Sequence, residues 1–221
     1  MRSIRALTVL AAVVAALPTI AQAQGGRGFK DSWFWGLKGG GYSLADSGQN
    51  YVQAPTVGVE WLITRTHGGL FVSGAQTFFS QHSFTLRDPL APLDSGLRPI
   101  AIKNMRRVDV ALMGFPGDHI RFHPYVGAGM SLMQIASARP DGPFSTEEQI
   151  NYAAAVIQEE RVAFSPFFIA GGQYRFRPLS VFGQLTASPA QKNFLAYNGK
   201  SFNFGYELGI RYNVGTSISK E

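Results

Sequence analysis

Residues 201–214, SFNFGYELGIRYNV, restrict the fold more than any other part of the chain. One set of alternate residues is apolar: Phe202, Phe204, Tyr206, Leu208, Ile210, Tyr212 and Val214. The other set is polar, small or charged and includes Glu207 and Arg211. Successive side chains of a β-strand point to opposite faces, so this segment has one apolar and one polar face. A soluble sandwich strand is seldom this long, whereas alternation over about 9–11 residues is typical of a transmembrane barrel strand.

Seven earlier segments also show strand alternation, which makes an even total of eight. Six of them have clear outward sets: Trp33, Trp35 and Leu37; Val57, Val59, Trp61 and Ile63; Val108, Val110 and Leu112; Val126, Ala128, Met130 and Leu132; Phe168, Ala170 and Tyr174; Leu179, Val181 and Leu185. The remaining segment, residues 70–84, is less decided. Its polar Gln76, Ser80 and His82 indicate that even positions face inward, which leaves Phe71, Ala75 and Phe79 outside.

The connections between these segments alternate between short and long. Residues 64–68, 115–119 and 175–178 are short, whereas 43–53, 87–99, 136–160 and 189–200 are long. A meander of this kind has its short turns at one end and its long loops at the other, as outer-membrane barrels do. An open sheet edge in hydrocarbon would leave backbone groups unpaired, so the last strand must pair with the first. We therefore expect an all-β fold, an eight-stranded antiparallel up-and-down transmembrane β-barrel.

An eight-stranded barrel is just wide enough to be filled by its own side chains. Inward glycines such as Gly36, Gly58, Gly127 and Gly209 would make room for longer inward residues. The sequence predicts a packed polar lumen without an open pore. Its polar network is predicted to contain Lys38, Glu60, Arg107, Asp109, Gln173, Arg175, Glu207 and Arg211.

Outward aromatic residues are predicted to form two girdles at the membrane interfaces, where amphipathic rings are favoured. The girdle near the short turns would contain Trp33, Trp35, Trp61, Phe71, Tyr174 and Tyr212. The girdle near the long loops would contain Phe79, Phe164 and Phe202.

The first 23 residues have the features of a cleaved secretory signal peptide. Arg2 and Arg5 precede an apolar run over residues 6–17, and Ala21-Gln22-Ala23 forms a small-x-small cleavage site. We therefore expect a mature chain that begins at Gln24 and a single barrel domain over residues 24–221. The chain has no Cys, which excludes disulfides, thiolate metal sites and a lipoprotein anchor. Its net charge of +6 is spread without basic runs, so no nucleic-acid partner is expected.

One long connection carries a helix signal, and no motif predicts catalysis. Residues 145–148 (STEE) form a capping-box start, and the apolar spacing that follows predicts a short helix or, alternatively, prolonged flanking strands. We interpret Glu147, Glu148, Glu159 and Glu160 as a solvated loop face rather than a divalent-ion site. Residues 199–201 (GKS) lack the first glycine and the following helix of a phosphate-binding loop. We expect no catalytic, cofactor or metal site.

Three phrases resemble the small eight-stranded outer-membrane barrels of the OmpA/OmpX/OmpW-like superfamily: residues 123–129 (HPYVGAG), 171–176 (GGQYRF) and 208–212 (LGIRY). The resemblance covers residues 31–214. It implies outer-membrane location and assembly with periplasmic chaperones and the barrel-insertion machinery. The tail 215–221 departs from the family, which commonly ends on an aromatic residue.

Three functions remain open, and the protein is expected to be a monomer surrounded by outer-membrane lipids. The first is a structural or surface-interaction role through the long loops. The second is passage or binding of small hydrophobic molecules. The third is lipid modification, since Ser80 and His82 share a predicted face, although the motifs of barrel deacylases and acyltransferases are not found around them.

Overall fold

The structure is a computed structural model that describes residues 29–45, 51–66, 68–87, 97–116, 121–142, 144, 146–197 and 201–216. The predicted signal peptide over residues 1–23 and the predicted new N-terminus at Gln24 lie outside the described residues. So do residues 217–221 of the predicted tail, whereas Gly215 and Thr216 belong to the last strand.

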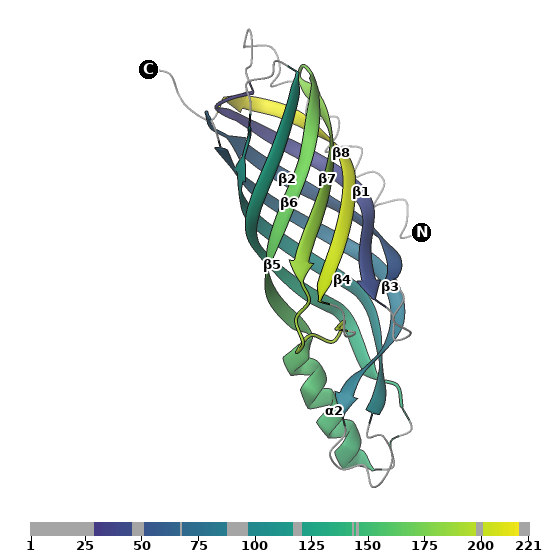
Figure 1. The fold of residues 1–221 in the computed structure, drawn as a ribbon. Helices are drawn as coiled ribbons and strands as arrows, with labels where there is room; N and C mark the ends of the chain where they lie inside the picture. The colour runs from purple at the N-terminus through teal and green to yellow at the C-terminus, as the bar shows by residue number, and fades with distance from the viewer. Residues whose placement is uncertain are drawn as a thin grey trace, which may run out of the picture.

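The described chain forms a closed barrel in which each strand pairs with its sequence neighbours (Figure 1). The strands are β1 (Ser32–Ala45), β2 (Tyr51–Thr64), β3 (Gly68–Arg87), β4 (Leu97–Gly114), β5 (Phe122–Pro140), β6 (Val162–Phe176), β7 (Leu179–Pro189) and β8 (Phe202–Thr216), and the helix is α2 (Glu147–Glu160). All pairings are antiparallel, including the closing pair of β1 and β8, which runs from Ser32 opposite Thr216 to Ser43 opposite Phe204. The predicted fold class is confirmed.

Figure 1 shows α2 beyond one end of the barrel, which we call the outer end, and we call the opposite end the turn end. The strand ends at Thr64 and Gly68, Gly114 and Phe122, and Phe176 and Leu179 lie at the turn end, and those at Ala45 and Tyr51, Arg87 and Leu97, Pro140 and Val162, and Pro189 and Phe202 lie at the outer end. The connection lengths do not alternate strictly, because β1 and β2 continue past their predicted ends and are separated by fewer residues than β4 and β5. The stronger asymmetry is in the strands, since β3, β4 and β5 have 20, 18 and 19 residues.

The inward and outward faces match the alternation in seven strands, but β3 is an exception. Phe71 and Ala75 are buried in the barrel together with Ser73 and Thr77, so the odd positions of β3 face inward. The predicted register of residues 70–84 was wrong by one residue. Its polar even-numbered residues Gln76, Ser80 and His82 lie at and beyond the outer edge of the membrane-facing wall, where the outside of the barrel is itself polar.

Two apolar clusters close the barrel above and below its centre. The cluster at the turn end includes Phe29, Phe34, Leu62, Met113, Phe115 and Ile169. The cluster at the outer end includes Ile100, Ile102, Met105, Met133 and Ile135 from the strands and Phe194 and Leu195 from the connection between β7 and β8. The predicted packed lumen therefore has an apolar cluster toward each end, with the residues between the two clusters mainly polar.

The predicted helix is present, and it packs against the outer cluster. Its N-cap is Thr146, whose hydroxyl accepts a hydrogen bond from the Gln149 amide at 3.3 Å. Thr146 and Gln149 have the capping-box spacing, so the helix starts one residue later than the predicted capping box over residues 145–148. Ala153 and Ile157, one turn apart, are buried against the extended strands. No helix among the described residues is long and apolar enough to cross a membrane.

Candidate functional site

A hydrogen-bonded network fills the centre of the barrel. Glu207 accepts hydrogen bonds from Lys38 Nζ at 2.8 Å, from Arg107 at 2.8 Å and from Gln184 at 2.7 Å. Arg107 also pairs with Asp109 at 3.0 Å. Arg211 binds Glu60 through its Nε and donates to Gln173 at 2.6 Å and to Gln184 at 3.4 Å. The structure thus brings together seven of the eight residues predicted for the lumen: Lys38, Glu60, Arg107, Asp109, Gln173, Glu207 and Arg211.

The eighth predicted residue, Arg175, lies elsewhere. It is near the turn end of β6, where it lines a surface cavity of about 610 Å³ together with Arg121 and Arg177. Its backbone amide donates to the carbonyl of Arg121 at 2.9 Å. Arg175 faces inward as expected, but too close to the end of the barrel to join the central network.

Sequence reasoning missed four members of the network. Ser73 and Ser131 donate to Asp109 at 3.0 and 2.7 Å, and Tyr125 donates to Gln184 at 2.9 Å. Tyr125, Ser131 and Gln184 stand on correctly assigned inward faces, so their positions could have identified them. Ser73 could not be identified from its face, because the sequence pattern assigned the wrong face of β3 to the lumen.

The charges of the network balance and are stacked against aromatic rings. Three cations (Lys38, Arg107 and Arg211) meet three anions (Glu60, Asp109 and Glu207), all buried. The Arg211 guanidinium lies 4.0 Å from the Phe182 ring and 5.2 Å from the Tyr125 ring. Arg107 lies 4.9 Å from the Tyr42 ring. Cation–π contacts are strongest where water is excluded, as it is here.

Inward glycines make room for this packing. A Cβ atom on Gly36 would stand 2.8 Å from the Glu60 side chain, and a Cβ atom on Gly209 would stand 2.6 Å from the Phe182 ring. Any side chain at either position would displace the groups that hold Arg211. These two glycines therefore belong to the network although they donate no side-chain hydrogen bond.

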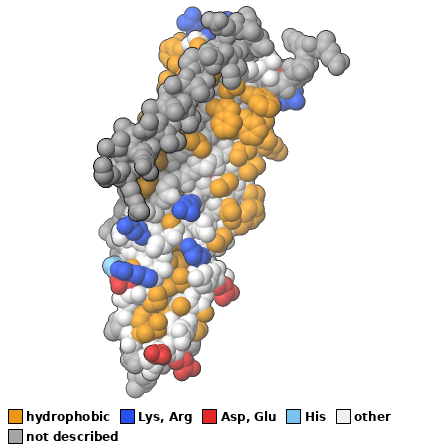
Figure 2. Space-filling model, turned by 180° about the vertical axis from the view of Figure 1, so that it is seen from behind, with side chains coloured by type: hydrophobic (Ala, Val, Ile, Leu, Met, Phe, Trp, Pro, Cys, Tyr) orange, Lys and Arg blue, Asp and Glu red, His pale blue; other side chains and the backbone are white. Residues whose placement is uncertain are grey.

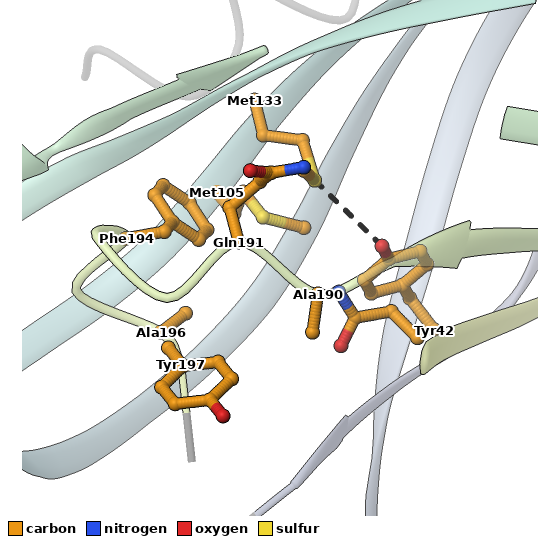
Figure 3. A pocket seen from close by; sticks show the side chains of 9 residues that line it. Tyr42, Met105, Met133, Ala190, Gln191, Phe194, Ala196 and Tyr197 are labelled. Atoms are coloured by element: carbon orange, nitrogen blue, oxygen red, sulfur yellow. Dashed lines mark hydrogen bonds between the residues drawn. The ribbon is translucent and has the colours of Figure 1, made fainter. Parts of the chain in front are cut away.

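The connection between β7 and β8 covers the outer mouth of the lumen (Figure 3). Phe194 and Gln191 face Met105 and Met133, and the Tyr42 hydroxyl contacts the Met133 sulfur at 3.7 Å. The space left among these side chains is too narrow to hold a water molecule. The amide of Leu195 donates to the carbonyl of Glu160 at 3.0 Å, which attaches this connection to the end of α2.

The outside of the barrel carries an apolar belt flanked by aromatic rings. Val59, Val110, Val126, Val181, Leu185 and Leu208 are among its exposed members. At the turn end, the Trp61 ring lies 5.5 Å from Trp33 and 5.8 Å from Trp35, and Tyr174 and Tyr212 also stand on the outward face. Toward the outer end, Phe164 and Phe202 are exposed.

Two of the residues predicted for the girdles are not on the lipid side. Phe71 is 1% exposed and lies inside the barrel with the Lys38 ammonium 5.6 Å from its ring. Phe79 packs against the outer apolar cluster, and its neighbour Phe78 is exposed instead. Both errors have the same cause, the reversed faces of β3.

The features that could suggest chemistry do not assemble into a site. His82 Nε2 contacts an Asp141 carboxylate oxygen at 2.5 Å in an exposed pair, and no hydrogen bond joins Ser80 to His82 among the described residues. Glu147, Glu148 and Glu159 are exposed on α2. Within the described ranges, no group of three His, Asp or Glu side chains could hold a metal ion.

Comparisons with known proteins agree on the fold. No protein-family model matches the chain, and no curated protein matches it. Neisserial surface protein A is similar in structure, with a TM-score of 0.50 and 12% identity over 81% of this chain and 96% of that chain. The N-terminal barrel of Pseudomonas aeruginosa OprF (TM-score 0.46, 11% identity, 83% and 98% coverage) and Yersinia pestis Ail (TM-score 0.45, 11% identity, 84% and 99% coverage) are also similar. The chain therefore has the fold of the small eight-stranded outer-membrane β-barrel proteins.

Proposed function

We propose that the protein is a monomeric, non-enzymatic outer-membrane barrel whose role is structural or surface interaction, delivered by its outer end. The observation that carries the proposal is the closed lumen. Among the described residues, a central network that draws side chains from all eight strands fills the middle of the barrel, which supports a function on its outside.

The outer end consists of extended strands and a helix that pack together. About 9–11 residues are enough for a strand to cross a bilayer, so 20, 18 and 19 residues in β3, β4 and β5 extend well beyond one face of it. The extended part is fixed by the outer apolar cluster, and α2 packs on it through Ala153 and Ile157. Ile150 and Tyr152 stay exposed on the same helix and offer apolar contact surface to a partner.

The two rival functions have weaker support among the described residues. Passage of a small hydrophobic molecule needs a path into the lumen, but the space at the outer mouth is too narrow for water. An open cavity of about 240 Å³ lies beside Leu185, Phe204 and Tyr206, but β1 and β8 stay paired there. Lipid modification needs a nucleophile next to its base, and Ser80 makes no hydrogen bond to His82 within the described chain.

Cysteine labelling on whole cells tests the location and the sidedness together. The chain has no Cys, so a single introduced Cys is the only labelling site. A membrane-impermeant maleimide should label Asn151→Cys on α2 and should leave Arg177→Cys at the turn end unlabelled until the cells are broken. Labelling of Arg177→Cys alone, or of neither variant in the outer-membrane fraction, would refute the proposed placement.

A binding comparison tests the role itself. Purified wild type and the variant Ile150→Ser/Tyr152→Ser are compared against a panel of extracellular matrix proteins. A surface-interaction role predicts a ligand that the variant binds more weakly. Flux of a small hydrophobic dye into protein-containing liposomes above the protein-free rate would instead support passage.

A further inference from the structure

A group of exposed cations borders the apolar belt on the outer part of β4 and β5. Along β4, Leu112, Val110 and Val108 face outward in turn, and Arg106 and Lys103 follow them toward the outer end. Arg139 of the neighbouring strand β5 is also exposed. We call Lys103, Arg106 and Arg139 the outer basic patch. Figure 2 shows Lys and Arg side chains gathered in this region, beside a His and next to the apolar wall.

A backbone irregularity in β4 places both of its patch cations, Lys103 and Arg106, on the outside. Met105 and Ile102 are both buried in the outer apolar cluster although they are three residues apart. The alternation of inward and outward side chains along β4 is interrupted at Asn104, where the inward positions change from odd to even numbers. Asn104 has a positive φ of 57° and accepts a hydrogen bond from the Phe79 amide at 3.2 Å. Asn tolerates this left-handed conformation better than most residues. Arg106 and Lys103 therefore both point outward on either side of Asn104.

The strand register puts the three cations close together. Lys103 pairs with Ser137, and Arg139 lies two residues farther along β5. Such diagonal neighbours are about 7–8 Å apart. Arg106 lies three residues from Lys103 on the same strand, about 10 Å at the usual rise per residue. Long, flexible side chains at these spacings can converge on one headgroup.

The surroundings of the patch supply hydrogen-bonding groups, and the nearby Asp141 carboxylate is paired with His82. The register neighbours of Arg106 and Lys103 are uncharged: Gln76, Gln134, Ser80 and Ser137. Among the described residues, no carboxylate lies within ion-pair distance of the three cations. Asp141, two residues beyond Arg139, is held by His82. Three positive charges beside amides and hydroxyls suit phosphate oxygens, which accept hydrogen bonds from all of them.

We propose that the outer basic patch binds an anionic lipid headgroup that carries more than one phosphate, in the leaflet that surrounds the outer end. The inference rests on the proposed outer-membrane placement and adds the class of lipid. A headgroup lies where the apolar belt gives way to polar surface, and Lys and Arg at that level gain about 1 kcal/mol each from anionic lipid. A zwitterionic headgroup would leave most of the three charges unmatched.

Native mass spectrometry of the folded protein in nonionic detergent tests the proposal. The probes are lipid A with two phosphates, lipid A with one phosphate, and phosphatidylcholine. The test variant is Lys103→Gln/Arg106→Gln/Arg139→Gln. The matched control, Arg65→Gln/Arg121→Gln/Arg177→Gln, removes the same charge at the turn end. The single variants Lys103→Gln and Arg106→Gln repeat the comparison if the triple variant does not fold.

The wild type and the control should bind the diphosphorylated lipid more tightly than the other two probes. The triple variant should bind it about 100-fold more weakly, and each single variant about fivefold more weakly, as about 1 kcal/mol per cation requires. Equal binding by wild type and the patch variants, an equal loss in the control, or no preference for the second phosphate would overturn the inference. Whole-cell labelling of Asn151→Cys is independent of these results, so failure of the lipid preference alone leaves the proposed function standing.

Discussion

Replacing Glu207 by Gln should destabilise the barrel by about 3–5 kcal/mol, the usual cost of breaking a buried ion pair by removing one partner. The variant keeps the shape of the side chain but leaves three cations and two anions in the network, an excess of one positive charge. Arg107 retains Asp109 at 3.0 Å, whereas Lys38 retains the Ser73 hydroxyl at 3.1 Å and the Phe71 ring at 5.6 Å but no anion. The uncompensated charge therefore falls mainly on Lys38.

A double-mutant cycle separates this pair from the rest of the network. Lys38→Met removes the partner charge with a side chain of similar length, and the double variant restores the balance of charges. The double variant should cost less than the sum of the two single variants by roughly 1–3 kcal/mol, the range for groups in direct contact. The neighbouring variant Leu208→Val serves as a control, because Leu208 is 67% exposed on the lipid side and lipid can fill the lost volume.

Equilibrium urea unfolding in phosphatidylcholine vesicles measures all four variants, with fluorescence of the three Trp residues as the signal. The free energy of unfolding should fall far more for Glu207→Gln than for Leu208→Val. A coupling energy near zero between Lys38→Met and Glu207→Gln would refute the ion pair that joins β1 to β8. Equal costs for Glu207→Gln and Leu208→Val would refute the assignment of faces in β8.

Three further predictions follow from individual contacts and a fourth from the leader sequence. Phe71→Ala should lower the free energy of unfolding by about 3–5 kcal/mol, as expected for a buried ring, and Phe78→Ala should lower it by clearly less. If vesicle unfolding gave the reverse order, the even positions of β3 would face inward instead. Ile157→Ala should speed hydrogen exchange in α2 while the strand amides stay protected, since its contacts fix the helix and not the barrel. Desolvation by burial raises the pKa of the Glu160 carboxyl, so its protonated form is favoured in the folded state. The amides of α2 should therefore be better protected from hydrogen exchange below that pKa than above it. Glu160→Gln should abolish this pH dependence. Mass spectrometry of membrane-purified protein should find Gln24, or its pyroglutamate, at the N-terminus, and an unprocessed chain would contradict export by cleavage.

The faces of most strands could be predicted because lipid and lumen impose opposite requirements. In β8, every outward position from Phe202 to Ile210 is apolar and exposed, and the two inward charges are buried. The same rule fails where a strand leaves the bilayer, because water then lies on the outside and polarity no longer marks the lumen. The even-numbered polar residues of β3 come from that region, and they led to the wrong faces for Phe71 and Phe79.

The apolar ends of the lumen were not predictable from alternation. Met105, Met133 and Ile135 face inward although they stand beyond the polar network, because this part of the interior is covered by α2 and by Phe194. Which segment covers the mouth depends on contacts between connections far apart in the sequence. A pattern within one strand carries no information about them.

Closure of the barrel and formation of the network depend on each other. β1 and β8 are the strands farthest apart in sequence, so their pairing pays the largest loop-closure entropy. The same seam carries the ion pair of Lys38 with Glu207, and Glu207 also binds Arg107 from the opposite part of the wall. A seam that opened to admit a solute would separate these buried charges at a cost of several kcal/mol. A barrel with this centre is therefore suited to hold its outer surface in a fixed arrangement, and poorly suited to open as a channel.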